Sequence, residues 1–181
     1  KKSPLVNRVF VAPGNAGTAE DTENVSIPEM DFARLIRFAR ENRVELTVVG
    51  PEAPLAAGIV DAFRAERLRI FGPSKEAAEL ESSKVFCKQL LRSANVPTAE
   101  FQVFSDPESA RQYLLDREDV PIVVKADGLA AGKGVIVCKN REEALAAVEK
   151  IAEKKAFRAA RNSILTEPPR HADEPSVLAN T

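Results

Sequence analysis

The chain has 181 residues, of which 44% are hydrophobic and 29% are charged, and its 26 basic and 27 acidic side chains leave a net charge of −1. Such a composition is typical of a globular protein with a buried core, and the balanced charge argues against a general attraction to nucleic acid or to a membrane surface. The single histidine, His171, excludes HExxH zinc sites and most Ser-His-Asp triads.

The first region of the chain alternates short apolar strands with amphipathic helices. In chain order, we expect strand, helix, strand, helix and strand at residues 9–12, 31–42, 46–49, 54–66 and 68–71. Asp31 is the predicted N-cap of the first helix. Apolar strands that are separated by helices indicate a parallel sheet covered on both faces. Residues 1–73 are therefore predicted to form an incomplete doubly wound α/β domain.

The second region, residues 74–181, has a different order of helices and strands. In chain order, we expect helix, strand, helix, two strands, helix and strand at residues 82–94, 100–104, 107–117, 122–126, 135–138, 141–154 and 163–166. Asp106 is a predicted N-cap. The two consecutive strands are joined by a short loop, so they should pair antiparallel. Three prolines in "TEPPRHADEP" predict an irregular end.

The stretch "VVKADGLAAGKGVIV" at residues 123–137 begins and ends as a strand but has three glycines and two lysines between. One interpretation is a hairpin with solvated lysines, in which glycine supplies positive φ angles. The other is a cover for phosphates, in which small residues expose backbone N–H groups and lysines balance negative charge. The spacing is not that of a P-loop, because Lys133 is followed by glycine and then by a strand.

Lys125 favours the phosphate interpretation. It shares a strand face with Val123, so the base of its side chain should be held by packed structure while its ammonium group emerges at the turn. A lysine that is held in this way can direct its charge at one place, whereas a fully solvated lysine cannot.

Four segments together resemble a known enzyme family. "ESSKVFCKQLLRSANVPTAEFQVF" and "PIVVKADGLAAGKGVIV" are similar to the opening of an ATP-grasp domain. "VFVAPGNAGTA" and "LTVVGPEAPLAAGIVDAFRAERLRIFGPS" resemble the N-terminal domain of the phosphoribosylamine–glycine ligases within that superfamily. The resemblance implies that residues 1–73 are the domain that precedes the ATP-grasp domain, and that residues 74–181 are the first part of the ATP-grasp domain with an antiparallel lid.

The resemblance implies a binding site for ATP. In the family, a lysine at the start of a helix and a lysine on the strand before the lid contact the phosphates, the lid closes over them, and a hinge holds the adenosine. The matching positions are Lys84, Lys125, Gly128, Gly132, Lys133, Gly134, Glu167 and Glu174. Pro168 and Pro169 depart from the hinge pattern, because proline lacks the N–H donor that a hinge presents to adenine.

The resemblance also implies a reaction. The family joins glycine to 5-phosphoribosylamine in purine synthesis, with ATP as cosubstrate, Mg²⁺ or Mn²⁺ as the metal and an acyl phosphate as intermediate. Two turns at strand ends match the loops that face the ribosylamine phosphate. Their residues are Gly14, Asn15, Gly17, Thr18, Gly50, Pro51 and Glu52. No catalytic side chain is assigned, and the metal ligands are expected outside these 181 residues.

The family's first strand is not found ahead of Lys1, nor is its metal-binding half found after the hinge. We therefore expect this chain alone to be inactive in the family's reaction. Two alternatives stay open at this point: a module that binds nucleotide or phosphate without catalysis, and another ATP-grasp ligase of carboxylate and amine.

The two cysteines, Cys87 and Cys138, sit in apolar patterns, and a pair at these positions makes no disulfide framework. No segment is apolar enough for a membrane span, and the first residues lack the apolar region of a signal peptide. We expect a cytoplasmic protein, monomeric as in the full-length family, whose partners are small molecules.

Overall fold

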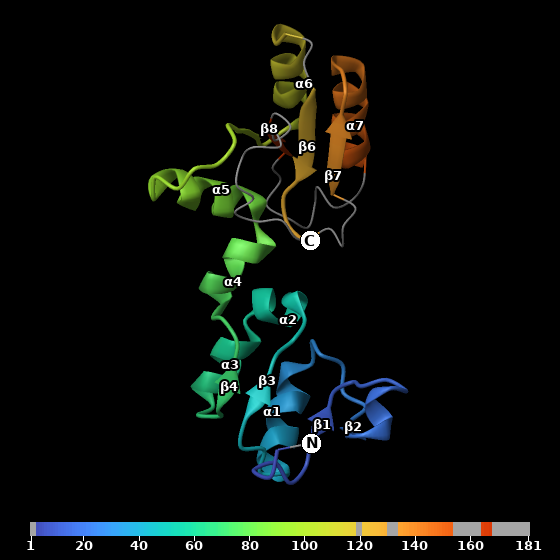
Figure 1. Ribbon diagram of the computed structural model, residues 1–181, viewed down its shortest axis with the longest axis vertical. Helices are drawn as coiled ribbons and strands as arrows, with labels where there is room; N and C mark the ends of the chain where they lie inside the picture. Colours follow the sequence, from blue (N-terminus) through green and yellow to red (C-terminus); the bar gives the residue numbers. More distant parts are fainter. Residues whose placement is uncertain (1–2, 119–120, 130–133, 154–163, 168–181) are drawn as a thin grey trace. The chain divides into compact units, whose positions relative to one another are not determined.

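A computed structural model describes residues 3–118, 121–129, 134–153 and 164–167. The chain divides into two compact units, Lys1–Ala78 and Glu79–Thr181, which are described separately below (Figure 1). In the described residues, no helix is both long and apolar enough to cross a membrane. The predictions for Gly132, Lys133 and Glu174 lie outside the described residues.

The first unit contains two separate pairs of parallel strands. Strand β1 (Phe10–Val11) pairs with β2 (Glu23–Asn24), and β3 (Thr47–Val48) pairs with β4 (Ile70–Phe71). The three predicted strands and their parallel pairing are thus confirmed, although they lie in two separate pairs and not in the one sheet that was predicted. Strand β2 was not predicted, because its two polar residues carry neither apolar alternation nor β-branched side chains.

The helices of the first unit begin and end at residues with clear physical roles. A short 3₁₀ turn, η1 (Thr18–Glu20), follows the first glycine turn. Helix α1 (Phe32–Glu41) begins where the Asp31 carboxylate accepts a hydrogen bond from the Arg34 N–H at 3.1 Å, as predicted.

The helix expected at residues 54–66 is in fact two helices, α2 (Glu52–Ala57) and α3 (Ile59–Ala65). Gly58 separates them, with a φ of 93° in the left-handed region. This conformation ends an α-helix at little cost only when the residue has no Cβ, so the prediction of one continuous helix was wrong.

The core of the first unit is made mainly by helices. Its fully buried members are Ala39 of α1 and Ile59, Val60 and Phe63 of α3. Burying an aliphatic or aromatic side chain of this size contributes about 1.5–3 kcal/mol. Strands β3 and β4 contribute less to this core, since Val48 of β3 is 66% exposed.

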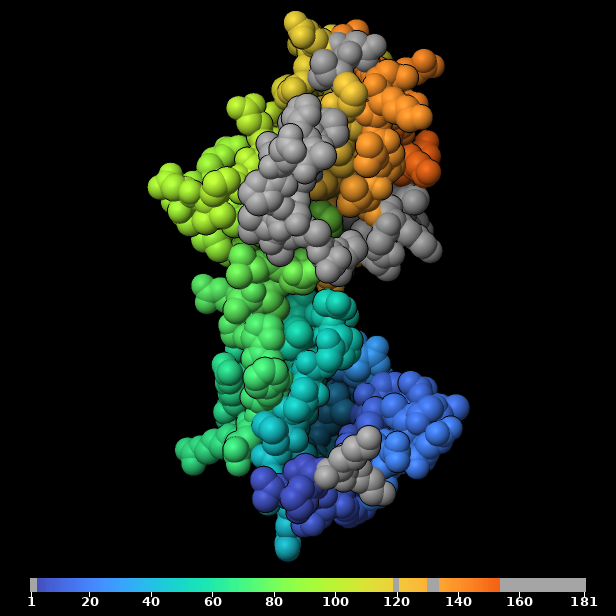
Figure 2. Space-filling view, viewed as in Figure 1, coloured from blue at the N-terminus to red at the C-terminus, as the bar shows by residue number. Residues whose placement is uncertain are grey.

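A pocket of about 390 Å³ opens in the first unit between the two strand pairs. Its walls include Phe10 of β1, Thr47 and Val48 of β3, and Phe38 of α1. Figure 2 shows the hollow between the blue surface of the first residues and the cyan surface that follows. The strands on its two sides therefore belong to different hydrogen-bonded pairs, with space between them.

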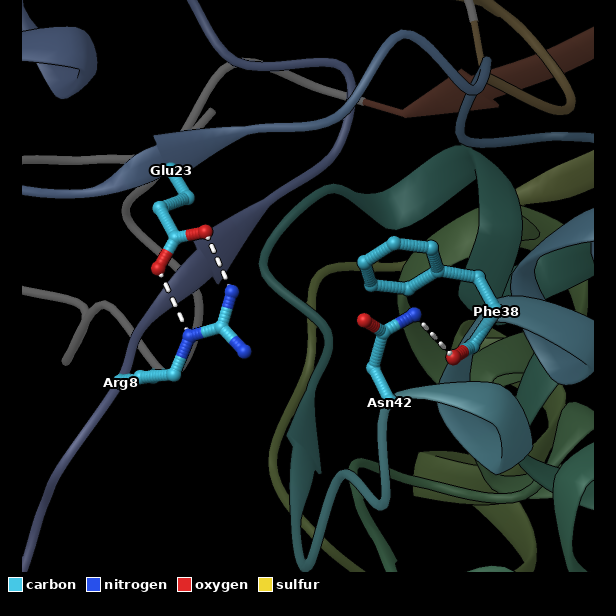
Figure 3. A network of polar contacts seen from close by, with 4 residues as sticks. All are labelled: Arg8, Glu23, Phe38 and Asn42. Carbon is cyan, nitrogen blue, oxygen red and sulfur yellow. Dashed lines mark hydrogen bonds and ion pairs between the residues drawn. The ribbon is translucent and has the colours of Figure 1, made fainter.

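Polar contacts hold the pair β1 and β2 together (Figure 3). The Arg8 guanidinium donates two hydrogen bonds to the Glu23 carboxylate, at 2.8 and 2.6 Å, in the paired geometry that suits these two groups. In the same view, the Asn42 side chain donates to the Phe38 carbonyl at 3.0 Å and so satisfies a carbonyl at the end of α1.

The second unit contains one four-stranded antiparallel sheet in the order β5-β8-β6-β7. The strands are β5 (Gln102–Phe104), β6 (Ile122–Ala126), β7 (Val135–Cys138) and β8 (Ile164–Glu167). The bounds of β6 and β7 agree with the prediction, as does their antiparallel pairing.

The helices of the second unit are α5 (Lys84–Ser93), α6 (Pro107–Asp116) and α7 (Arg141–Glu153). Asp106 caps α6 as predicted, accepting from the Ser109 N–H at 2.8 Å. Ahead of them lies α4 (Lys75–Ser82), which was not predicted and whose residues are divided between the two units. Its only buried residue is Ala78, so its sequence lacks a strong apolar stripe.

Helices α6 and α7 pack against each other and cover one face of the sheet (Figure 1). The core between them takes alternate residues of β6, namely Ile122, Val124 and Ala126. Because side chains alternate along a strand, Val123 and Lys125 lie on the opposite face. The helices therefore leave the Lys125 face of the sheet uncovered by this core.

Candidate functional site

The start of α5 is the centre of the candidate site. Ser83 is the N-cap of this helix, and its hydroxyl oxygen accepts from the Phe86 N–H at 3.1 Å. Ser83 is only 7% exposed, so the cap is held inside the unit. The side chain that comes next, Lys84, thus leaves from the first turn of a helix whose start is fixed.

Asp127 ties this helix start to the end of β6. Its two carboxylate oxygens each lie 3.1 Å from the Ser83 hydroxyl, which donates to them, and one oxygen also accepts from the Val85 N–H at 3.2 Å. The carboxylate is buried, and two groups at the start of α5, the Ser83 hydroxyl and the Val85 N–H, therefore depend on a residue more than 40 positions away in sequence.

Lys84 reaches across to the glycine turn. Its ammonium donates to the Gly128 carbonyl at 3.0 Å. Burial lowers the pKa of Lys84, while the Asp127 carboxylate raises it, the Lys125 ammonium lowers it and Glu81 raises it. A second cation and a carboxylate are therefore close enough to Lys84 for their charges to affect it, and two neighbouring cations suit a polyanion.

Lys125 lies on β6, opposite Val135 of β7 and Leu165 of β8. It is half-buried, whereas Val123 on the same strand face is only 8% exposed. The arrangement predicted from the sequence, with the base of the side chain held among packed residues, agrees with this burial.

The described ends of the glycine turn are close together. Gly128 has a φ of 93°, and Gly134 is buried and its carbonyl accepts from the Ala126 N–H at 2.7 Å. Glu167 ends β8, where its backbone is paired with Val123. The turn therefore leaves and rejoins the sheet next to the two lysines.

In the first unit, the predicted loop at Gly14–Thr18 follows the end of β1. Gly14 has a φ of 76°, and a Cβ at this position would lie 2.3 Å from the Asn24 side chain. The Asn24 side-chain amide donates to the Asn15 carbonyl at 2.7 Å. The Thr18 hydroxyl donates to the side-chain oxygen of Asn24 at 2.8 Å. Gly17 is the N-cap residue of η1. The loop is thus held in one shape by a neighbouring strand.

The second predicted loop, Gly50–Glu52, follows β3. Gly50 and Pro51 line the pocket of the first unit, and Glu52 is the first residue of α2. A Cβ at Gly50 would meet nothing within 4 Å. Both predicted loops therefore lie at the carboxyl ends of parallel strands, where α/β sheets bind ligands.

Three polar residues that hold these sites were not predicted from the sequence. Ser83 and Asp127 hold the start of α5, and Asn24 holds the first loop. The sequence signal for Ser83 was present, because serine is a preferred N-cap and precedes an amphipathic helix. Asp127 had no such signal, since its partners lie far away in the chain.

The comparison with protein families now settles the family. Residues 1–81 match the family model described as "Phosphoribosylglycinamide synthetase, N domain", and residues 82–181 match the one described as "Phosphoribosylglycinamide synthetase, ATP-grasp (A) domain". The chain belongs to the phosphoribosylamine–glycine ligase family. The resemblance stated from its motifs is confirmed.

Individual relatives of the ligase family agree with this result. A phosphoribosylamine–glycine ligase of Rhodopirellula baltica is 54% identical over all of this chain, which covers 43% of that protein. The crystal structure of the same enzyme from Thermotoga maritima has a TM-score of 0.68 at 29% identity, over 90% of this chain and 38% of that one. A biotin carboxylase structure from Campylobacter jejuni, with a TM-score of 0.69 at 18% identity, shows the shared fold.

The chain thus spans about 43% of the length of this ligase relative. Membership of the ATP-grasp superfamily implies ATP and a divalent metal as cofactors. In the described part of the chain, no group of three or more His, Cys, Asp or Glu side chains is arranged to hold a metal ion. Cys87 and Cys138 are free and buried, and burial raises the pKa of both thiols, which suits the prediction that they act as small apolar residues.

Proposed function

We propose that this chain supplies the phosphate-binding part of the ATP site, and part of the substrate site, of a phosphoribosylamine–glycine ligase. ATP phosphorylates the glycine carboxylate to give an acyl phosphate and ADP. The amine of 5-phosphoribosylamine then attacks the acyl carbon, and phosphate leaves. The names of the relatives and the family models support this reaction.

One observation carries the proposal: the Lys84 ammonium donates to the carbonyl of Gly128, the first glycine of the turn. This contact brings Lys84, from the first ATP-grasp motif, next to the glycine turn of the second motif, which also carries Lys125. In such a transfer, positioning and charge neutralisation around the phosphates provide most of the catalysis. Lys84 and Lys125 would bind and orient the phosphates, and the glycine turn at 128–134 would cover them.

The residues present suit ATP better than they suit the metal. Two neighbouring lysines match the charge of a triphosphate, whereas the described residues offer no cluster for Mg²⁺ or Mn²⁺. When bound, the metal would neutralise charge on the phosphates of ATP. We propose that its ligands lie outside the described residues. We propose that Glu167 and Glu174 bind the adenosine part of ATP.

On the substrate side, we propose that the loops at Gly14–Thr18 and Gly50–Glu52 face the phosphate of 5-phosphoribosylamine. Their location at strand ends and the fixed shape of the first loop support this. We further propose that residues 1–73 and 74–181 are the two domains, that the protein works in the cytoplasm, and that it is monomeric.

A thermal-shift titration with Mg²⁺ and ATP tests the proposal. A ligand that binds only the folded chain raises its stability, by about 2.7 kcal/mol at a concentration 100 times its Kd. We expect this stabilisation in the wild type and its loss in Lys125→Ala. Lys150→Ala is the matched control, because Lys150 is an exposed lysine on α7. A wild type that ATP does not stabilise, or equal shifts in all three proteins, would contradict the proposal.

A further inference from the structure

Asp127 is a buried carboxylate beside two lysines, and the proposed reaction does not by itself explain why it is there. It follows β6 directly and is only 8% exposed. A buried carboxylate is costly unless it is hydrogen-bonded and paired with positive charge. Asp127 has both, since it accepts from Ser83 and from the Val85 N–H and lies near Lys84.

These contacts fix the relative placement of the two lysines. Lys125 lies two residues before Asp127 on the same backbone, at the end of β6. Lys84 lies between Ser83 and Val85, which are the two residues that Asp127 holds. The carboxylate therefore joins the strand that carries one lysine to the helix that carries the other.

The charge of Asp127 also acts on Lys84. Burial lowers the pKa of Lys84, and the neighbouring Lys125 lowers it further, while Asp127 and Glu81 oppose both effects. Without the Asp127 carboxylate, only Glu81 would oppose the effects of burial and of the Lys125 charge, and Lys84 would lose its proton at a lower pH.

We propose that Asp127 is a positioning residue of the nucleotide site, which holds Lys84 and Lys125 at a fixed separation before a polyphosphate binds. This inference rests on the proposed function, because it concerns the same two lysines. Asp127 itself does not contact the nucleotide. Its carboxylate acts through the Ser83 cap and through the Lys84 ammonium.

The structure offers a matched control within the same unit. Asp106 also bonds to the first turn of a helix, here as its N-cap, and accepts from the Ser109 N–H and hydroxyl, both at 2.8 Å. It belongs to α6, which packs on the other face of the sheet. Asp106→Asn therefore makes the same chemical change at a helix cap that has no part in the proposed site.

The test is the affinity for ATP with Mg²⁺, measured by calorimetry from about pH 7.5, where the terminal phosphate has lost its second proton, to about pH 9.5. Asp127→Asn keeps the size of the side chain and one acceptor oxygen but removes the charge. We expect its Kd to rise on the order of tenfold more over this range than the Kd of the wild type or of Asp106→Asn. Adding Lys84→Arg to Asp127→Asn should restore the pH dependence of Kd seen in the wild type, since a guanidinium does not titrate in this pH range.

A second pair of variants guards against a failure to fold. Ser83→Ala removes the hydroxyl that links the helix to Asp127, and Ser109→Ala removes the equivalent hydroxyl at Asp106. We expect the first to weaken ATP binding several-fold more than the second, with the pH profile of the wild type. Equal effects of the two serine variants, or equal pH profiles for Asp127→Asn and Asp106→Asn, would overturn the inference alone. Wild-type chain that fails to bind ATP would overturn the proposed function with it.

Discussion

The two units of this protein build their cores in different ways. In the second unit, β6 and β7 contribute fully buried side chains such as Val124 and Cys138, which pack against two helices. In the first unit, the buried residues of the core cluster come from helices, and strand residues such as Val48 and Phe71 are 66% and 69% exposed. A continuous sheet buries the faces of its strands, whereas two separate pairs leave much of them in water.

The largest effect is expected in the helix-made core of the first unit. Phe63→Ala should lower the stability of this unit by about 3–5 kcal/mol, because the ring is 1% exposed and its removal leaves a cavity. Phe71→Ala, at the exposed strand position, should change stability by less than about 0.5 kcal/mol. Hydrogen exchange of the backbone amides in α1 and α3 measures the loss of stability in both variants. Equal losses would mean that the strands carry the core of this unit as well.

The second unit should show the opposite pattern, with a strand residue carrying the core. Val124→Ala removes two methyl groups at a position with no exposure and should cost about 2 kcal/mol. Val137→Ala changes a β7 residue that is 66% exposed and should be close to neutral. Urea unfolding followed by hydrogen exchange in β6 distinguishes them, and a loss of similar size for both variants contradicts the comparison.

The predictions from sequence succeeded where local pattern decides the structure. The bounds of β6 and β7 agree because apolar β-branched runs stop at a glycine turn, and the caps at Asp31 and Asp106 agree because each carboxylate bonds three residues ahead. They failed at Gly58, because a single glycine in a helical pattern is compatible both with one continuous helix and with two helices.

The site divides along the same line. Lys84 and Lys125 could be found from their motifs, because each motif is contiguous. Their junction through Asp127 could not, because an aspartate before a glycine reads as an ordinary turn residue and its partners lie 42 and 44 positions away. Tertiary contacts of this kind leave no periodicity in the sequence.

The loops of the first unit offer a smaller and sharper test. Gly14→Ala places a Cβ against Asn24 at a positive φ and should cost about 1–2 kcal/mol or more for the backbone conformation alone. Gly50→Ala meets no neighbouring atom within 4 Å and should be nearly neutral. Thermal unfolding measures the difference. If Gly14→Ala were as stable as Gly50→Ala, the loop would not be held by Asn24.

The smallest effect concerns pH and the second unit. Hydrogen bonds from the backbone and side chain of Ser109 hold the pKa of Asp106 below its usual value. The stabilisation from this cap is therefore present above the pKa of the unfolded chain and is lost as the pH falls through the lower pKa of the folded chain. Asp106→Asn should flatten this acid loss slightly, as followed by helical circular dichroism between about pH 5 and pH 2. An unchanged profile would contradict the role of this cap.

The central claim is that Lys84 and Lys125 are brought together to bind phosphates, and the most direct measurement compares ATP with AMP. Calorimetric titration of the wild type should show clearly tighter binding of ATP with Mg²⁺ than of AMP, because only ATP reaches both ammonium groups. Lys84→Ala and Lys125→Ala should each reduce that preference on the order of tenfold, the value of one charge-assisted contact. A preference that both variants retain in full would contradict the claim.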